Sequence, residues 1–191
     1  MYDFLKGLVW LFTKLIYKID YKGLENIPDE GAFILVGNHK SNFDPIVISF
    51  TTKRKIHYLA KAELFKTKFT KWLFESVRCI SIDRSKNDIT AIKNALKLLK
   101  RGDILGIFPE GTRIKDGTEN VQIKSGAAMI ASKAKVNILP VAISANYRIF
   151  STIKITILPM YDMEVAKEKY DNDIEKISED IMAKIYSEVK K

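Results

Sequence analysis

The sequence predicts an α/β fold: a single domain with a largely parallel sheet flanked by helices, preceded by an N-terminal amphipathic interfacial helix. Three observations support this prediction. With 191 residues the chain is long enough for one domain with a substantial core. Its 47% hydrophobic and 29% charged residues are typical of a folded protein and exclude extensive disorder. Short apolar segments alternate with amphipathic segments along most of the chain.

Residues 1–20 are predicted to form an amphipathic helix, ahead of a domain that spans residues 21–191. The uncharged stretch from Gly7 to Thr13 is far shorter than the ~20 residues of a membrane-spanning helix. The helix therefore either lies in a bilayer interface or packs on the domain core, and its flanking lysines and large apolar surface favour the interface. The apolar side chains fill an arc of ~160° on a helical wheel. They are Phe4, Leu5, Leu8, Val9, Leu11, Phe12, Leu15 and Ile16.

The remaining elements alternate between strands and helices. We expect strands at residues 32–36, 56–60, 79–82, 104–108, 137–144 and 154–158. We expect helices at residues 45–50, 63–75, 88–100 and 125–135, and a last helix that begins near residues 171–173. Short apolar strands separated by amphipathic helices are typical of parallel strands joined by crossover helices.

The net charge of +9 is spread unevenly. Residues 162–191 hold nine acidic and six basic residues, a net −3, so the first 161 residues carry +12. Residues 51–72 hold seven basic residues and one acidic residue. This segment is either a solvated lysine-rich face or a binding patch for a polyanion such as nucleic acid, an anionic membrane or a phosphorylated substrate. The basic residues are Lys53, Arg54, Lys55, Lys61, Lys66, Lys68 and Lys71.

Polar residues follow each of the first four expected strands. His39 follows the first strand, Lys61 the second, Arg84 the third, and the sequence PEGTR at 109–113 the fourth. In open α/β sheets, ligands bind outside the carboxyl ends of the strands. We therefore expect these side chains to share one rim of the sheet.

The spacing of His39 and Asp44 raises three possibilities: a catalytic base with its orienting carboxylate, half of a metal site, or a loop without chemistry. A histidine changes charge near neutral pH, so it can take a proton from a hydroxyl, and a carboxylate on its other nitrogen stabilises the imidazolium. The only other histidine, His57, lies in an expected strand, and the single Cys79 excludes a multi-cysteine zinc site, so we predict no metal. Ser41 lacks a nucleophile-elbow motif, which favours direct attack by a substrate hydroxyl.

Four sequence blocks resemble those of the glycerolipid acyltransferases. NHKSNFDP at 38–45 matches their N-H-x-x-x-x-D-P block, and FPEGTR at 108–113 matches F-P-E-G-x-R. AKAELF followed by CISIDR is similar to their second block, and ILPVAIS to their fourth. The blocks occur in the family's order and span residues 37–144, which makes the resemblance specific. One departure is Arg78, at a position where the family often has a glycine.

The resemblance implies an α/β acyltransferase of the lysophosphatidate type. Such an enzyme transfers a fatty acyl chain from a thioester of acyl carrier protein or coenzyme A to 1-acyl-sn-glycerol 3-phosphate, giving phosphatidate, without a further cofactor. It implies that His39 is the general base and Asp44 its orienting partner. The implied substrate-binding residues are Lys61 and Arg84 for the phosphate, and Glu110, Gly111, Thr112 and Arg113 for the acceptor.

The expected setting is an anionic membrane surface at the cytoplasmic face of the cell membrane, with the enzyme bound peripherally. Alternative acceptors are another lyso-lipid, such as a lyso-ornithine lipid, or glycerol 3-phosphate. A non-catalytic protein that binds anionic lipid is a further alternative, but it gives no reason for the paired polar residues at the strand ends. A nucleic-acid partner is not expected, because the sequence has no recognised nucleic-acid module.

Overall fold

Among the residues that the structure describes, seven strands form one mixed sheet in the order β1-β7-β6-β2-β5-β3-β4. The computed structural model describes residues 2–83, 88–114 and 122–189. Neighbouring strands are parallel except for β6 and β7, which confirms the predicted α/β fold with a largely parallel sheet. The strands are β1 (Lys18–Lys22), β2 (Phe33–Gly37), β3 (Ile56–Lys61), β4 (Cys79–Ile82), β5 (Ile104–Ile107), β6 (Ile138–Ser144) and β7 (Thr152–Ile157).

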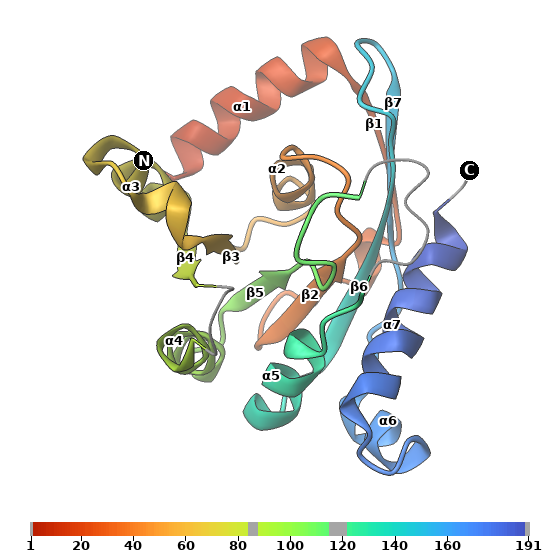
Figure 1. Cartoon of the computed structure of the whole chain (residues 1–191). Coiled ribbons are helices and arrows are strands. Elements are labelled where there is room, and N and C mark those ends of the chain that lie inside the picture. The colour runs from red at the N-terminus through yellow and green to blue at the C-terminus, as the bar shows by residue number, and fades with distance from the viewer. Residues whose placement is uncertain (1, 84–87, 115–121, 190–191) are drawn as a thin grey trace.

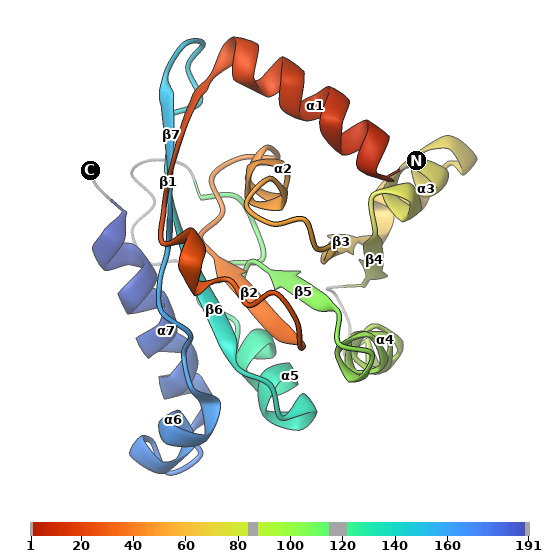
Figure 2. The same cartoon turned by 180° about the vertical axis from the view of Figure 1, so that it is seen from behind.

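Several helices pack along the sheet, whereas the first helix passes over one end of the molecule. Helices α4, α5 and α7 pack along one side, whereas α1 spans the top of the molecule, above α2, from β1 and β7 towards α3 (Figures 1 and 2). The α-helices are α1 (Tyr2–Ile16), α2 (Asp44–Ser49), α3 (Lys68–Ser76), α4 (Ile89–Lys100), α5 (Gly126–Ala134), α6 (Met163–Lys169) and α7 (Ile174–Glu188). Two 3-10 turns lie at η1 (Leu24–Asn26) and η2 (Ala62–Phe65).

The core lies on both faces of the central strands. On β2, Ile34 and Val36 pack into the layer formed with α4, α5 and α7. Phe33 and Leu35 point to the opposite face, where α2 packs. All five residues of β2 are buried, as expected for a parallel strand covered on both sides. The carboxyl end of β2 is therefore held rigidly, and the loop that follows it begins from a fixed point.

The N-terminal helix is shorter than predicted, and a strand follows it. Helix α1 ends at Ile16, and Lys18–Lys22 forms β1, which pairs with β7, so the predicted boundary at residue 20 falls inside a strand of the sheet. In β1, Ile19 and Tyr21 are half-buried, whereas the three charged residues are exposed. This alternation is that of a charged edge strand, which limits pairing with other chains.

The backbone conformation at Arg78 explains why the family often has a glycine at this position. It lies directly after α3 and its C-cap residue Val77, and its φ of 66° is in the left-handed region. Helices commonly end on such a residue, and glycine is preferred there because it has no Cβ. Arg78 is exposed, so the chain accommodates its side chain without burying the charge.

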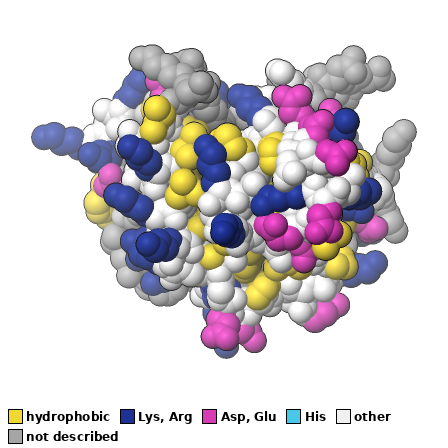
Figure 3. All heavy atoms as spheres, turned by 90° about the horizontal axis from the view of Figure 1, so that it is seen from below, with side chains coloured by type: hydrophobic (Ala, Val, Ile, Leu, Met, Phe, Trp, Pro, Cys, Tyr) yellow, Lys and Arg dark blue, Asp and Glu magenta, His cyan; other side chains and the backbone are white. Residues whose placement is uncertain are grey.

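The surface reflects the uneven charge of the sequence. Figure 3 shows Lys and Arg side chains spread over the left of one face, while Asp and Glu are more frequent on the right, the side of α6 and α7. Those helices lie within residues 162–191, the acidic segment of the chain.

Candidate active site

The position of His39 is fixed by the side chain of Asn38, which continues the hydrogen bonding of the sheet beyond β2. It lies two residues beyond β2, and the intervening Asn38 is buried. The amide of Asn38 donates to the carbonyl of Ile143 on β6 (2.9 Å) and accepts from its N–H (2.7 Å). This pair of hydrogen bonds imitates a strand ladder beyond Gly37, so it fixes the backbone at the point where His39 begins the loop.

His39 and Asp44 are in direct contact. Nδ1 of His39 lies 2.8 Å from Oδ2 of Asp44, whose side chain is fully buried. The same Oδ2 accepts the N–H groups of Lys40 and Ser41, each at 2.7 Å, and the hydroxyl of Tyr147 donates to Oδ1. The four intervening residues thus let the loop wrap around the carboxylate. With Nδ1–H donating to Asp44, Nε2 of His39 is the nitrogen left to accept a proton.

A column of aromatic rings packs against one face of the His39 imidazole. The ring of His39 stacks on Phe108 (4.3 Å between centroids), and Phe108 stacks in turn on Tyr58 of β3 (6.0 Å). A Cβ at position 106 of β5 would lie 2.3 Å from the Tyr58 ring, so this column requires Gly106. The stack restricts rotation of the imidazole, while 17% of the His39 side chain stays accessible.

Glu110 holds the backbone of His39 from the other side. Its Oε2 accepts the N–H of His39 (2.5 Å), and its Oε1 accepts the hydroxyl of Tyr186 on α7 (2.7 Å). The N–H of Ile114 also donates to the carbonyl of His39 (2.8 Å). Glu110 is only 4% exposed, and this burial raises its pKa to about 7, although the two hydrogen bonds oppose the shift.

The structure brings some of the predicted site residues together and leaves others apart. His39, Asp44 and Glu110 are joined by the hydrogen bonds above, whereas Lys61 is exposed at the end of β3 and Arg84 lies outside the described residues. Both oxygens of Glu110 bind protein donors, so its contact with an acceptor stays a prediction.

The turn after β5 exposes the last two residues of the FPEGTR block. Thr112 and Arg113 are exposed beside the buried Glu110. Gly111 has a φ of 66°, and a Cβ there would lie 3.1 Å from the Lys124 side chain. Glycine therefore serves both the left-handed backbone and the close approach of the lysine.

Two tyrosines of the site had no sequence signal. Tyr147 binds Asp44 from 103 residues away, and Tyr186 binds Glu110 from 76 residues away. Neither lies in one of the four sequence blocks. Only the arrangement of β6, β7 and α7 around the sheet shows that these hydroxyls reach the two carboxylates.

The predicted basic patch is divided between two ends of the sheet. Lys53 and Lys55 precede β3, whereas Lys61 is its last residue and the later lysines follow it, at the end where His39 lies. Arg54 is a structural residue, because its guanidinium donates to three backbone carbonyls. The acceptors are Pro28 (3.0 Å), Gly31 (2.5 Å) and Gly102 (2.7 Å).

Exposed apolar side chains lie around the end of the molecule that α1 crosses. They come from α1, from the turn and helix that follow β3, and from the β6–β7 loop, whose Phe150 N–H donates to the carbonyl of Ile16 (2.8 Å). Among the described residues, no helix is long and apolar enough to cross a membrane. The exposed residues are Leu8, Trp10, Leu11, Phe12, Leu15, Ile16, Leu64, Phe69, Trp72, Ile149 and Phe150.

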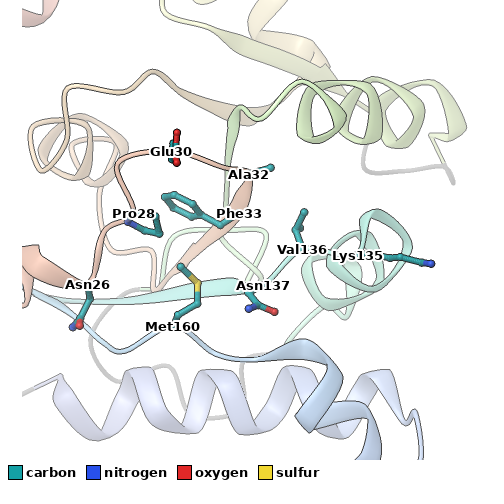
Figure 4. A pocket seen from close by; sticks show the side chains of 9 residues that line it. All are labelled: Asn26, Pro28, Glu30, Ala32, Phe33, Lys135, Val136, Asn137 and Met160. Atoms are coloured by element: carbon teal, nitrogen blue, oxygen red, sulfur yellow. The ribbon is translucent and has the colours of Figure 1, made fainter.

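Two other features lie outside this site. In the described part of the chain, no group of three or more His, Cys, Asp or Glu side chains is placed to hold a metal ion. A hollow of about 460 Å³ is lined by Phe33, Asn137 and Met160, among others (Figure 4). It lies at the amino ends of β2 and β6, the opposite edge of the sheet from His39.

The chain is similar to known acyltransferases. The acyltransferase family matches residues 18–144. A 1-acyl-sn-glycerol-3-phosphate acyltransferase of Bacillus subtilis is 33% identical over 143 residues, which cover 74% of this chain and 70% of the relative. One of Streptococcus pneumoniae is 36% identical over 147 residues, 73% of this chain and 53% of the relative. The crystal structure of the 1-acyl-sn-glycerophosphate acyltransferase PlsC from Thermotoga maritima has a TM-score of 0.69 and 28% identity, covering 94% of this chain and 77% of that one.

Proposed function

Because this chain belongs to the acyltransferase family, we propose that it transfers a fatty acyl group from a thioester to the free hydroxyl of 1-acyl-sn-glycerol 3-phosphate, giving phosphatidate. The names of its relatives support this acceptor. The observation that carries the proposed mechanism is the 2.8 Å contact between His39 and the buried Asp44. The acyl donor, a thioester of acyl carrier protein or coenzyme A, is part of the same proposal.

His39 acts as the general base in this proposal. Its Nε2 takes the proton of the glycerol hydroxyl while the hydroxyl oxygen attacks the thioester carbonyl carbon. The carbon–sulfur bond then breaks, and the imidazolium returns the proton to the thiolate, so the products are an ester and a free thiol. Asp44 stabilises the imidazolium between these steps.

Cationic side chains at the same edge of the sheet are proposed to bind the acceptor phosphate. Arg113 is exposed in the turn that carries Glu110, and Lys61 is exposed at the end of β3. Arg84 follows the next strand in sequence and completes the predicted set. A guanidinium binds phosphate with two parallel hydrogen bonds, which suits the phosphomonoester of the proposed acceptor.

The direct test replaces His39 with alanine. Purified protein is incubated with a labelled acyl thioester and a panel of acceptors: 1-acyl-sn-glycerol 3-phosphate, glycerol 3-phosphate and a lyso-ornithine lipid. We expect His39→Ala to lower kcat by at least ~10²-fold, the lower limit for loss of a general base. His57→Gln is the matched control, because His57 is the only other histidine and lies within β3. Equal activity of the wild type and His39→Ala would contradict the mechanism, whereas absence of acyl transfer in both would favour a non-catalytic lipid-binding protein.

The apolar end of the molecule is proposed to dock on an anionic membrane at the cytoplasmic face of the cell. Leu15 is 65% exposed on α1, and Phe150 is 81% exposed on the β6–β7 loop. Burying both in lipid favours binding by several kcal/mol, at ~1.5–3 kcal/mol for a large apolar side chain.

This docking is tested with the double variant Leu15→Ser/Phe150→Ser and vesicles that contain phosphatidylglycerol. We expect vesicle binding to fall by at least ~10-fold. The matched control is Val165→Ser, because Val165 is 62% exposed but lies on α6, at the opposite end of the molecule (Figure 1). An equal loss of vesicle binding in both variants, or no loss in either, would contradict docking through this end.

A further inference from the structure

Asp44 is surrounded by donors from two parts of the chain. Three of its contacts, to the ring of His39 and the N–H groups of Lys40 and Ser41, come from its own loop and converge on Oδ2. The fourth comes from the hydroxyl of Tyr147, which donates to Oδ1. Because Asp44 is fully buried, the protein itself supplies the partners of both oxygens.

Tyr147 is held in place by contacts on both sides of its ring. Tyr17, the first residue after α1, packs edge-on against it (6.1 Å), and the Tyr17 hydroxyl donates to the Tyr147 carbonyl (3.4 Å). Phe43, which precedes Asp44 in the loop, packs against the same ring (6.2 Å). Tyr147 also has a left-handed φ of 53°, a conformation that bulky residues rarely adopt unless their surroundings impose it.

We propose that Tyr147 is a positioning residue of the acyl-transfer site, whose hydroxyl fixes the Asp44 carboxylate in the orientation that binds Nδ1 of His39. This inference rests on the proposed acyl-transfer function. Oδ2 alone could accept its three donors over a range of carboxylate rotations, whereas a donor on Oδ1 restricts that rotation. Burial and the charge of Asp44 both raise the pKa of Tyr147, so its hydroxyl keeps the proton that it donates.

The test variant is Tyr147→Phe, which removes the hydroxyl and retains the ring that Tyr17 and Phe43 contact. We expect kcat to fall by ~10–100-fold, with the KM values for both substrates changed by less than ~3-fold, because the hydroxyl does not touch substrate. In an Asp44→Asn background, the same substitution should lower kcat by less than ~3-fold, because Tyr147 acts through Asp44.

A pH profile separates positioning from a merely structural role. Without the hydroxyl, Oδ1 carries unshared negative charge, and a nearby negative charge favours the protonated, inactive form of a general base. The acid limb of the kcat/KM profile should therefore move up by about one pH unit. The shape of this profile does not depend on the fraction of protein that is folded. The variant leaves the other titratable groups near His39 and Asp44 unchanged. They are Tyr17, which packs on Tyr147, Lys40, whose N–H binds Asp44, and Glu110 with its partner Tyr186.

Tyr161→Phe is the matched control, because the Tyr161 hydroxyl also donates to a carboxylate, Asp180, at 2.7 Å but away from His39. We expect the control to keep the wild-type profile. If Tyr147→Phe behaves as the control does while the wild type is active, the inference is wrong and the proposed function stands. If the wild type transfers no acyl group to any acceptor in the panel, the proposed function itself is wrong.

Discussion

Two carboxyl groups flank His39, and they hold different parts of it. Asp44 contacts the imidazole ring, whereas Glu110 contacts the backbone N–H of the same residue. Both carboxyl groups are buried. The donors to Asp44 are mainly N–H groups of its own loop, while Glu110 is completed by Tyr186 on the C-terminal helix.

This difference assigns different roles to the two acids. A carboxylate on the ring determines which imidazole nitrogen carries the proton and stabilises the charge that develops on the ring. A carboxyl group that binds the backbone N–H determines only the position of the ring. Asp44 should therefore affect the chemical step strongly, whereas Glu110 should affect its geometry and the stability of the fold.

The largest effect is expected for Asp44→Asn. The amide keeps the size of the side chain but removes its charge, and it favours the wrong tautomer of His39. We expect kcat to fall by ~10³–10⁴-fold, as for the orienting acid of a catalytic triad. Single-turnover assays on folded protein measure the effect, and a loss of less than ~10-fold would mean that Asp44 does not act on the ring.

A smaller effect is expected for Glu110→Gln. The amide still offers one acceptor oxygen, but it cannot accept both the His39 N–H and the Tyr186 hydroxyl through two charged oxygens. A displacement of the imidazole by a fraction of an ångström should lower kcat by ~10–100-fold. If Glu110→Gln costs as much as Asp44→Asn, Glu110 takes part in the chemistry or binds the acceptor directly, as the family resemblance implies.

The smallest effect concerns stability and its dependence on pH. The pKa of Glu110 is about 7 in the folded chain, against an ordinary value of 4.5, so the folded chain binds this proton more tightly. Its contribution to the free energy of unfolding is therefore complete below pH 4.5 and is lost as the pH rises through 7.

Urea unfolding of the wild type and Glu110→Gln at pH 5 and pH 8 measures this contribution. The wild type should lose up to about 3 kcal/mol relative to the variant over this range. Tyr161→Phe, which leaves Glu110 intact, is the control and should follow the wild-type pH dependence. A difference between wild type and Glu110→Gln that is constant with pH would show that Glu110 does not titrate there.

Patterns local in sequence predicted most of the sheet. The central strands are short apolar runs, and their burial on both faces follows from that composition. The mostly charged KIDYK sequence of β1 does not predict a strand, and β1 is stabilised by pairing with β7 at the edge of the sheet. The sequence predicts the N-terminal helix to residue 20, whereas it ends at Ile16, because a helical pattern does not show where a neighbouring strand begins.

The sequence by itself determined the pairing of His39 with Asp44. Four intervening residues form one loop, and the N–H groups of that loop bind the carboxylate as soon as it turns back. Only the tertiary structure decided what surrounds this pair. Tyr147 and Tyr186 reach the two carboxyl groups because the sheet and α7 bring distant segments to one edge, and hydroxyl donors leave no periodic pattern in the sequence. A local motif can specify the reacting groups, but the burial that restricts their motion comes from the packing of the whole domain.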